Sequence, residues 1–191
     1  LDKLSSEAEI AVREGYKHLI LSDKQLSENR VAIPMILAFG AVNSKLVNLG
    51  IRSFASINIQ TGETLDTHSF AVLLGIGATT INPYLAFDSI YQRYEKKLFS
   101  KLSYEECVQR YIKSVDNGLL KIMSKMGISV LSAYRGGCNF ETVGLSRAVV
   151  AEYFPGMISR ISGIGILGIE KKIKELHKKA FQKNLSILPI G

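Results

Sequence analysis

Between residues 117 and 137 the sequence changes from a helical pattern to a short apolar run and then to a turn. The helical pattern stops at Gly127, and glycine commonly ends helices because it adopts a positive φ without strain. Residues 128–132 then form an apolar run of strand length, and Gly136 with Gly137 opens a tight turn. The segment predicts one helix, strand and loop step of an α/β layer.

The same order of elements recurs along the chain. Ser6 with Glu9 and Ser103 with Glu106 have the spacing of capping boxes, which mark helix starts. We expect strands at residues 18–21, 53–60, 79–82 and 128–132. We expect helices at residues 6–14, 34–49, 68–74, 84–94, 103–126 and 146–153, another around Phe140, and a last one after the glycine-rich run 159–165.

Strands that alternate with helices imply parallel strands joined by right-handed crossovers. Four such units are about half of an eight-unit barrel. A helix, a break at Gly75 and Gly77, and then a short strand resemble the way barrel helices turn into strands. We therefore predict an α/β fold whose parallel sheet resembles a partial, rudimentary TIM barrel, in a single domain over residues 1–191. A doubly wound open sheet is the alternative.

The formal net charge is +7, which would suit a polyanionic partner. The lysines gather between residues 171 and 183, where Ile169, Ile173, Leu176 and Ala180 form an apolar stripe that we expect to face inward. Lysines opposite such a stripe are typical of a solvated helix face, and no aromatic residues alternate with them as single-strand binding requires. We predict no nucleic-acid partner, and a basic nucleic-acid-binding module stays open as an alternative.

The apolar runs and the cysteines indicate the compartment. The longest runs, such as residues 70–74, are far too short to cross a bilayer, so we expect no membrane partner. The first residues lack a signal-peptide pattern, and Cys107 and Cys138 lack disulfide or metal spacing, so we expect a cytoplasmic protein with reduced thiols. The ends at Leu1 and Gly191 lead us to expect a piece of a longer protein.

The run from Arg160 to Gly165, before the terminal helix, is a candidate anion site. Backbone amides at a helix N-terminus and one arginine can hold phosphate, and in a barrel such a loop would cradle a flavin phosphate. This possibility supports one alternative function, a free-standing flavin- or phosphate-binding protein. We favour the simpler interpretation of a tight connection in which Arg160 pairs with a carboxylate.

The other candidates also have a structural interpretation that we prefer. Asp66 and His68 would form an acid–base pair, or else a polar helix cap. Asp23, after Ser22 at a strand end, has catalytic placement in a barrel, or forms an ordinary turn. Cys138 would be a nucleophile near a helix start, or else a small buried thiol. We predict no catalytic, cofactor-binding or metal residues in this chain.

Six stretches resemble, in order, the central domain of the glutamate synthase large subunit. They are residues 19–23, 68–78, 81–86, 117–136, 140–145 and 159–163, and the resemblance covers nearly the whole chain. Three positions depart from the family pattern. Lys24 replaces an arginine, which weakens any bidentate role. Ser69 replaces the second histidine of a pair, which argues against a catalytic or metal role there, and Ser162 replaces a glycine.

The resemblance implies the C-terminal part of a central, connecting domain. The parent enzyme makes two glutamates from glutamine, 2-oxoglutarate and a reductant. Its amidotransferase domain releases ammonia, and a later barrel domain binds FMN and an iron–sulfur cluster, while the central domain between them has no cofactor. We therefore expect this chain to hold the two domains in register, to help wall the ammonia path, and to be inactive alone.

Arg135 and Arg160 are the residues that we expect at the contact with the FMN-binding domain. Both adjoin glycine-rich turns, where a backbone can approach a neighbour closely, and we expect both at strand or loop ends. An ion pair within the domain is the alternative for each of them.

Overall fold

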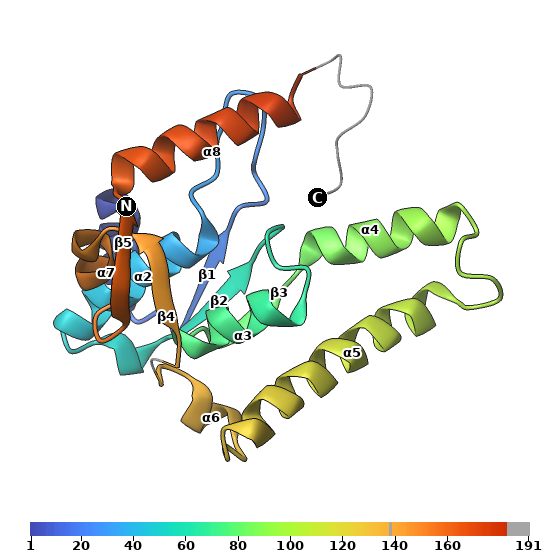
Figure 1. The fold of residues 1–191 in the computed structure, drawn as a ribbon, viewed down its shortest axis with the longest axis horizontal. Helices are drawn as coiled ribbons and strands as arrows, with labels where there is room; N and C mark the ends of the chain where they lie inside the picture. The colour runs from blue at the N-terminus through green and yellow to red at the C-terminus, as the bar shows by residue number, and fades with distance from the viewer. Residues whose placement is uncertain (138, 183–191) are drawn as a thin grey trace.

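The computed structural model describes residues 1–137 and 139–182, which form two small parallel sheets with helices around them (Figure 1). The elements are α1 (Asp2–Arg13), β1 (His18–Ser22), α2 (Met35–Asn48), the 3₁₀ helix η1 (Arg52–Phe54), β2 (Ser56–Gln60), α3 (Thr67–Gly75), β3 (Thr80–Asn82), α4 (Tyr84–Glu95), α5 (Tyr104–Lys125), α6 (Leu131–Tyr134), β4 (Glu141–Leu145), α7 (Arg147–Tyr153), β5 (Ile158–Ile164) and α8 (Ile166–Ala180).

The first sheet has the strand order β1-β2-β3, and both pairs are parallel. Side chains alternate along β1 and β2, so Leu19, Leu21, Ile57 and Ile59 point into one core. Residues of α1, α2 and α3 fill the same core, with Phe39 of α2 completely buried. One face of the sheet is therefore covered by the helices that precede and connect its strands.

The opposite face of the first sheet is open. Ile20 in the middle of β1 is 68% exposed, and polar side chains bond across the strands beside it. The Thr80 hydroxyl donates to Asn58 Oδ1 over 2.7 Å. Sequential strand order with helices on one face is the barrel arrangement, whereas doubly wound sheets carry helices on both faces. The α/β class with parallel strands is confirmed, although the described residues form no closed barrel.

The second sheet pairs β4 with β5 in parallel, with α7 as the crossover. A Cβ added to Gly163 in β5 would collide with the backbone of Gly144 in β4, so the strands need glycine where they meet. The predicted glycine-rich loop over residues 159–165 is wrong, because most of it is this strand. The predicted helix around Phe140 is also wrong, since β4 begins at Glu141.

The predicted strand at residues 128–132 is a turn followed by the short helix α6. Tyr134 at the end of α6 is buried against Ala71 and Leu74 of α3 and Met123 of α5, and its hydroxyl donates to the Ala71 carbonyl. These contacts anchor the segment without strand pairing, while residues 129–132 stay exposed. We predicted four strands in one sheet, whereas the structure has one sheet of three strands and a separate sheet of two.

Most helix boundaries agree with the sequence. Gly15, Gly50 and Gly127 have positive φ where α1, α2 and α5 end, and Ser103 with Glu106 forms the predicted capping box at the start of α5. The predicted start at Ser6 is wrong, because α1 already begins at Asp2 without a side-chain cap. Helices α4 and α5 form a hairpin that projects from the first sheet (Figure 1).

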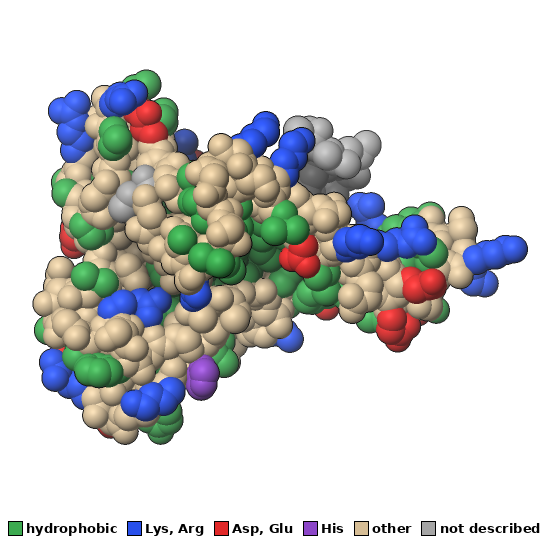
Figure 2. All heavy atoms as spheres, turned by 90° about the horizontal axis from the view of Figure 1, so that it is seen from below, with side chains coloured by type: hydrophobic (Ala, Val, Ile, Leu, Met, Phe, Trp, Pro, Cys, Tyr) green, Lys and Arg blue, Asp and Glu red, His purple; other side chains and the backbone are tan. Residues whose placement is uncertain are grey.

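The lysine-rich helix α8 lies over the connection between β1 and α2, where His177 Nε2 is 3.0 Å from the Glu28 carbonyl (Figure 1). Its N-terminal Ile169 packs on the core of α7, but Leu176 is 67% exposed, so the predicted inward stripe is wrong in its second half. Lysine and arginine side chains are spread over the face in Figure 2, with acidic and hydrophobic side chains between them. Within the described part of the chain, no helix is both long and apolar enough to span a membrane.

Replacing Asp66 with alanine is expected to lower the free energy of unfolding by about 1 kcal/mol near neutral pH. Asp66 caps α3, and hydrogen bonds from the amide and the hydroxyl of Ser69 lower the pKa of its carboxyl. A lowered folded pKa stabilises the protein above the unfolded pKa, and this contribution is lost as the pH falls through the folded pKa. Urea unfolding at about pH 7 and about pH 3 should therefore give a larger difference at about pH 7. Asp116→Ala, at an exposed position of α5, is the control. If Asp66→Ala lowered the free energy of unfolding equally at both pH values, the prediction would be wrong.

Candidate functional site

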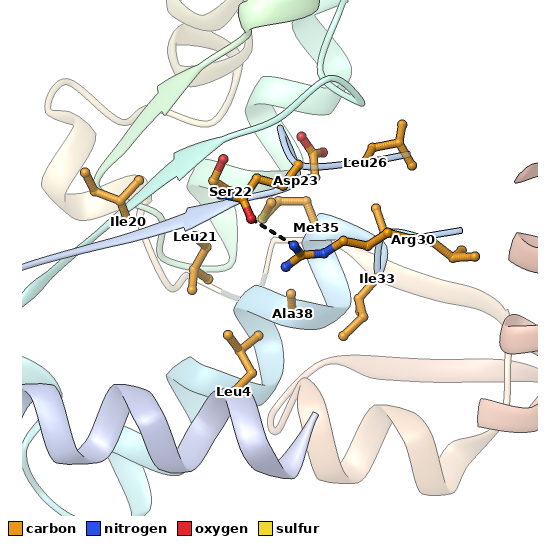
Figure 3. Close-up of a pocket in the computed structure, with 13 residues that line it drawn as sticks. Leu4, Ile20, Leu21, Ser22, Asp23, Leu26, Arg30, Ile33, Met35 and Ala38 are labelled. Atoms are coloured by element: carbon orange, nitrogen blue, oxygen red, sulfur yellow. Dashed lines mark hydrogen bonds between the residues drawn. The ribbon is translucent and has the colours of Figure 1, made fainter. Parts of the chain in front are cut away.

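The carboxyl end of β1 and the loop after it border a hollow of about 430 Å³ (Figure 3). Its floor is apolar and includes Leu4, Met35 and Ala38, while its rim carries Ser22, Asp23 and Arg30. Arg30 Nη1 donates to Gln25 Oε1 over 2.9 Å, which holds the guanidinium beside the rim. Open α/β sheets bind ligands beyond the carboxyl ends of their strands, so this edge is the first place to look for chemistry.

Asp23 joins the loops that follow β1, β2 and β3. Its carboxylate accepts from the Thr61 hydroxyl over 2.5 Å and from the Gly62 amide over 3.2 Å. The Tyr84 hydroxyl, at the start of α4, lies near enough to this carboxylate for Asp23 to affect its pKa. Parallel strands place their carboxyl ends at one sheet edge, which brings these residues together although they are far apart in sequence.

Two neighbours of Asp23 have shifted pKa values. Burial, the hydrogen bond to Asp23 and the nearby acidic charges raise the pKa of Tyr84 to about 12. Burial of the Glu63 carboxylate, which accepts from the Met35 amide at the start of α2, raises the pKa of Glu63, and the charge of Asp23 adds to this. Because its raised pKa keeps the Tyr84 hydroxyl protonated at neutral pH, Tyr84 is not prepared to act as a base there.

The network at the sheet edge therefore braces the loops. Asp23 was predicted either as a catalytic residue or as a turn, and the structure supports the turn, since the Asp23 carbonyl accepts from the Leu26 amide and the carboxylate is engaged by loop residues. Sequence reasoning missed Thr61, Glu63 and Tyr84. The turn residues directly after β2 and β3 were the available signal, because strand ends of a parallel sheet meet.

Arg160 lies inside β5 and not at a strand or loop end, so that part of the prediction is wrong. Its guanidinium is 3.6 Å from the Glu141 carboxylate of β4, which is the ion pair named as the alternative. The side chain is 74% exposed and the pair is solvated. The following Gly163 packs on Gly144, so these residues do not fit the cradle of a flavin phosphate.

Arg135 directly follows α6, at a loop end as predicted, and its side chain is partly buried. Its charge acts on Arg52 of η1, a residue that sequence reasoning missed. Arg135 and Arg160 belong to different parts of the fold, one beside η1 and α3 and the other in the second sheet. The interdomain role of both stays a prediction.

The remaining candidates have structural roles or lie outside the described residues. Asp66 caps α3, which confirms the helix-cap interpretation of Asp66 and His68. Gly77 has a positive φ just after α3, as expected of a helix stop. Cys107 is buried on α5, and Cys138 lies outside the described residues.

The sequence matches the family model described as glutamate synthase central domain over residues 1–146. The chain belongs to the glutamate synthase central domain family. It is 53% identical to the NADPH glutamate synthase large chain of Azospirillum brasilense, over 100% of this chain and 13% of that protein. It is 41% identical to the NADPH glutamate synthase large chain of Bacillus subtilis, over 97% of this chain and 12% of that protein.

Ferredoxin-dependent relatives match over a similar span. Identity to the chloroplastic ferredoxin-dependent glutamate synthase of Spinacia oleracea is 38%, over 96% of this chain and 12% of that protein. The central domain chain thus spans about one eighth of the length of these relatives. The similarity extends past residue 146, so α7, β5 and α8 have counterparts in the same large proteins.

Proposed function

We propose that this central domain is a connecting and scaffolding part of a glutamate synthase large chain. It would hold the amidotransferase domain and the FMN-binding domain in register and help to wall the ammonia path. The parent reaction would convert glutamine, 2-oxoglutarate and a reductant into two glutamates. The observation that carries the proposal is the engagement of Asp23, the carboxylate with catalytic placement, by residues of its own scaffold.

The chemistry of the chain's own side chains also supports a scaffold. The chain contains two cysteines, fewer than the cysteines that usually hold an iron–sulfur cluster. Gly163 and Arg160, the best candidates for a flavin phosphate, are used in pairing β4 with β5. We therefore place the FMN and the cluster in another domain of the parent chain and derive no step of the reaction through them here.

The open face of the first sheet and the position of Arg135 support contacts with other domains. Parallel sheets are usually covered on both faces, yet one face here leaves Ile20 exposed. Arg135 follows α6 and precedes Gly136, where an added Cβ would meet no described atom within 4 Å. We propose that Arg135 and Arg160 lie on the side that meets the FMN-binding domain. The ion pair with Glu141 gives Arg160 a local role as well.

The test uses full-length glutamate synthase carrying Arg135→Ala or Arg160→Ala. Loss of an interdomain contact should raise glutamine hydrolysed per glutamate formed by about fivefold or more, since coupling between sites typically has this size. Arg110→Ala, at an exposed position of α5, is the matched control and should leave the ratio unchanged. Arg135 should have the larger effect, because Arg160 is already paired.

The melting temperature separates an interface role from a local one. We expect this domain's melting temperature in the 191-residue chain to move little with either substitution. If a variant instead unfolds the chain while surviving full-length enzyme keeps its coupling, that arginine is structural and the interface assignment fails.

A further inference from the structure

Among the described residues, the groups that accept hydrogen bonds from Arg52 are all neutral. Its guanidinium donates to Asn43 Oδ1 over 2.7 Å, to the Ala55 carbonyl over 2.7 Å and to the Gly77 carbonyl over 3.1 Å. These three bonds fix the position of the group, and an arginine has five N–H donors in all. Arg52 is therefore rigidly held, half-buried, and able to donate further.

Arg135 brings a second positive charge to the same turn, because the adjacent Gly136 amide donates to the Gly75 carbonyl while Arg52 donates to the Gly77 carbonyl. Its Nε is buried and has no hydrogen-bond partner in the part of the chain that the structure describes. Burial, and then the charge of Arg135, lower the pKa of Arg52, which means that the two guanidinium groups repel each other. A buried donor without a partner is costly, and like charges at short range add to that cost.

No acidic side chain of the chain compensates these charges. Every Asp and Glu lies among the described residues, and the ion pairs described there include neither Arg52 nor Arg135. The carboxyl end of α3 lies nearby, since the Gly75 carbonyl accepts from the Gly136 amide over 2.8 Å. A helix end offers only about half an elementary charge, whereas two guanidinium groups carry two. A positive site therefore remains.

A hollow borders the residues that adjoin the two arginines. A hollow of about 100 Å³ is lined by Asn43, which holds Arg52, and by Gly136, which follows Arg135. A Cβ added to Gly136 would meet no described atom within 4 Å. Guanidinium groups bind carboxylates through paired, charge-assisted hydrogen bonds, and the planar fork of arginine suits that geometry better than lysine does.

We propose that Arg52 and Arg135 together form a carboxylate-binding site. Arg52 is the fixed half, held by its three carbonyl and amide contacts, and Arg135 closes on the carboxylate with its unpartnered Nε. The carboxylate is either an Asp or Glu side chain of a neighbouring domain or a free small carboxylate. Only the first source rests on the proposed function.

The first measurement is thermal melting of the 191-residue chain in about 0.1 M acetate and in chloride of equal ionic strength. The wild-type chain should melt about 3 °C higher in acetate than in chloride, because a ligand that binds only the folded state stabilises it. Arg135→Gln should lose this difference. Arg110→Gln, which removes an exposed charge on α5, should keep it. Equal responses of the wild type and both variants would overturn the site.

The second measurement repeats the comparison in full-length glutamate synthase and identifies the source. If a neighbouring domain supplies the carboxylate, acetate has no effect on the wild type, and Arg135→Gln melts at a lower temperature than Arg110→Gln. If the carboxylate is free, acetate raises the melting temperature as it does in the 191-residue chain. Should that chain not melt cooperatively, identical melting of both full-length variants in acetate and in chloride overturns the proposal. Failure of the proposed function appears separately, as intact coupling in Arg135→Ala.

Discussion

Replacing Tyr134 with alanine is expected to lower the free energy of unfolding by about 3 to 5 kcal/mol, the usual cost of removing a buried aromatic ring. Tyr134 is 1% exposed and packs among Ala71, Leu74 and Met123, with its ring edge-on to Phe140 at 6.5 Å. No smaller side chain in α6 can fill that space. Because total stability is typically about 5 to 15 kcal/mol, such a loss would leave a substantial unfolded fraction at physiological temperature.

One further variant separates the contribution of the ring from that of the hydroxyl, and another serves as a control. Tyr134→Phe keeps the ring and removes only the bond to the Ala71 carbonyl, so it should cost about 1 kcal/mol. Tyr16→Ala, at a residue outside the core, should stay within about 0.5 kcal/mol of the wild type. The measurement is urea unfolding of all three variants. A Tyr134→Ala value within about 1 kcal/mol of the wild type would show that α6 does not pack as described.

The contrast between Gly127 and residues 128–132 shows which parts of the fold the sequence could predict. Gly127 ends α5 because of its own backbone freedom, so a local signal was sufficient. The apolar run after it has the length of a strand, but it pairs with no strand, and the segment is held by contacts of the buried Tyr134 with α3 and α5 that are remote in sequence. Short apolar runs do not distinguish a strand from a buried turn or helix by periodicity alone.

The second sheet was hidden for a related reason. Gly163 was interpreted as part of a tight, glycine-rich connection, because glycine usually weakens strands. In the structure, the missing side chain lets β5 pass close to Gly144 of β4. That requirement belongs to a pair of strands, and neither glycine reveals it alone.

The candidate site residues show the same contrast between local signals and contacts that form only on folding. Asp23 was recognisable as a polar residue at a strand end, whereas Thr61, its partner, is 38 residues further along the chain. Arg52 had no signal at all, because its role depends on carbonyls of Ala55 and Gly77 that are presented only after folding. The family resemblance, by contrast, was confirmed. It depends on short sequence motifs in a fixed order, which can be recognised without knowing any long-range contact.

Replacing Asp23 with alanine is expected to lower the free energy of unfolding by about 3 kcal/mol, because hydrogen bonds to a charged group are strong and the loss leaves buried donors without partners. Thr61 is 0% exposed, so its hydroxyl has no access to water as a replacement partner. The Gly62 amide loses the same acceptor. Urea unfolding measures the difference, and Asp116→Ala should change stability by less than about 0.5 kcal/mol.

The variant Asp23→Asn then separates a brace from a catalytic residue. Asparagine keeps one oxygen acceptor of similar shape but loses the negative charge, so it should cost less than alanine and should lower the pKa of Tyr84 from its raised value, without removing the effect of burial. In full-length enzyme, a brace predicts that glutamate formation falls only as far as the folded fraction falls. If Asp23→Asn instead abolishes glutamate formation while its melting temperature stays within about 1 °C of the wild type, Asp23 takes part in the chemistry and the brace assignment is wrong.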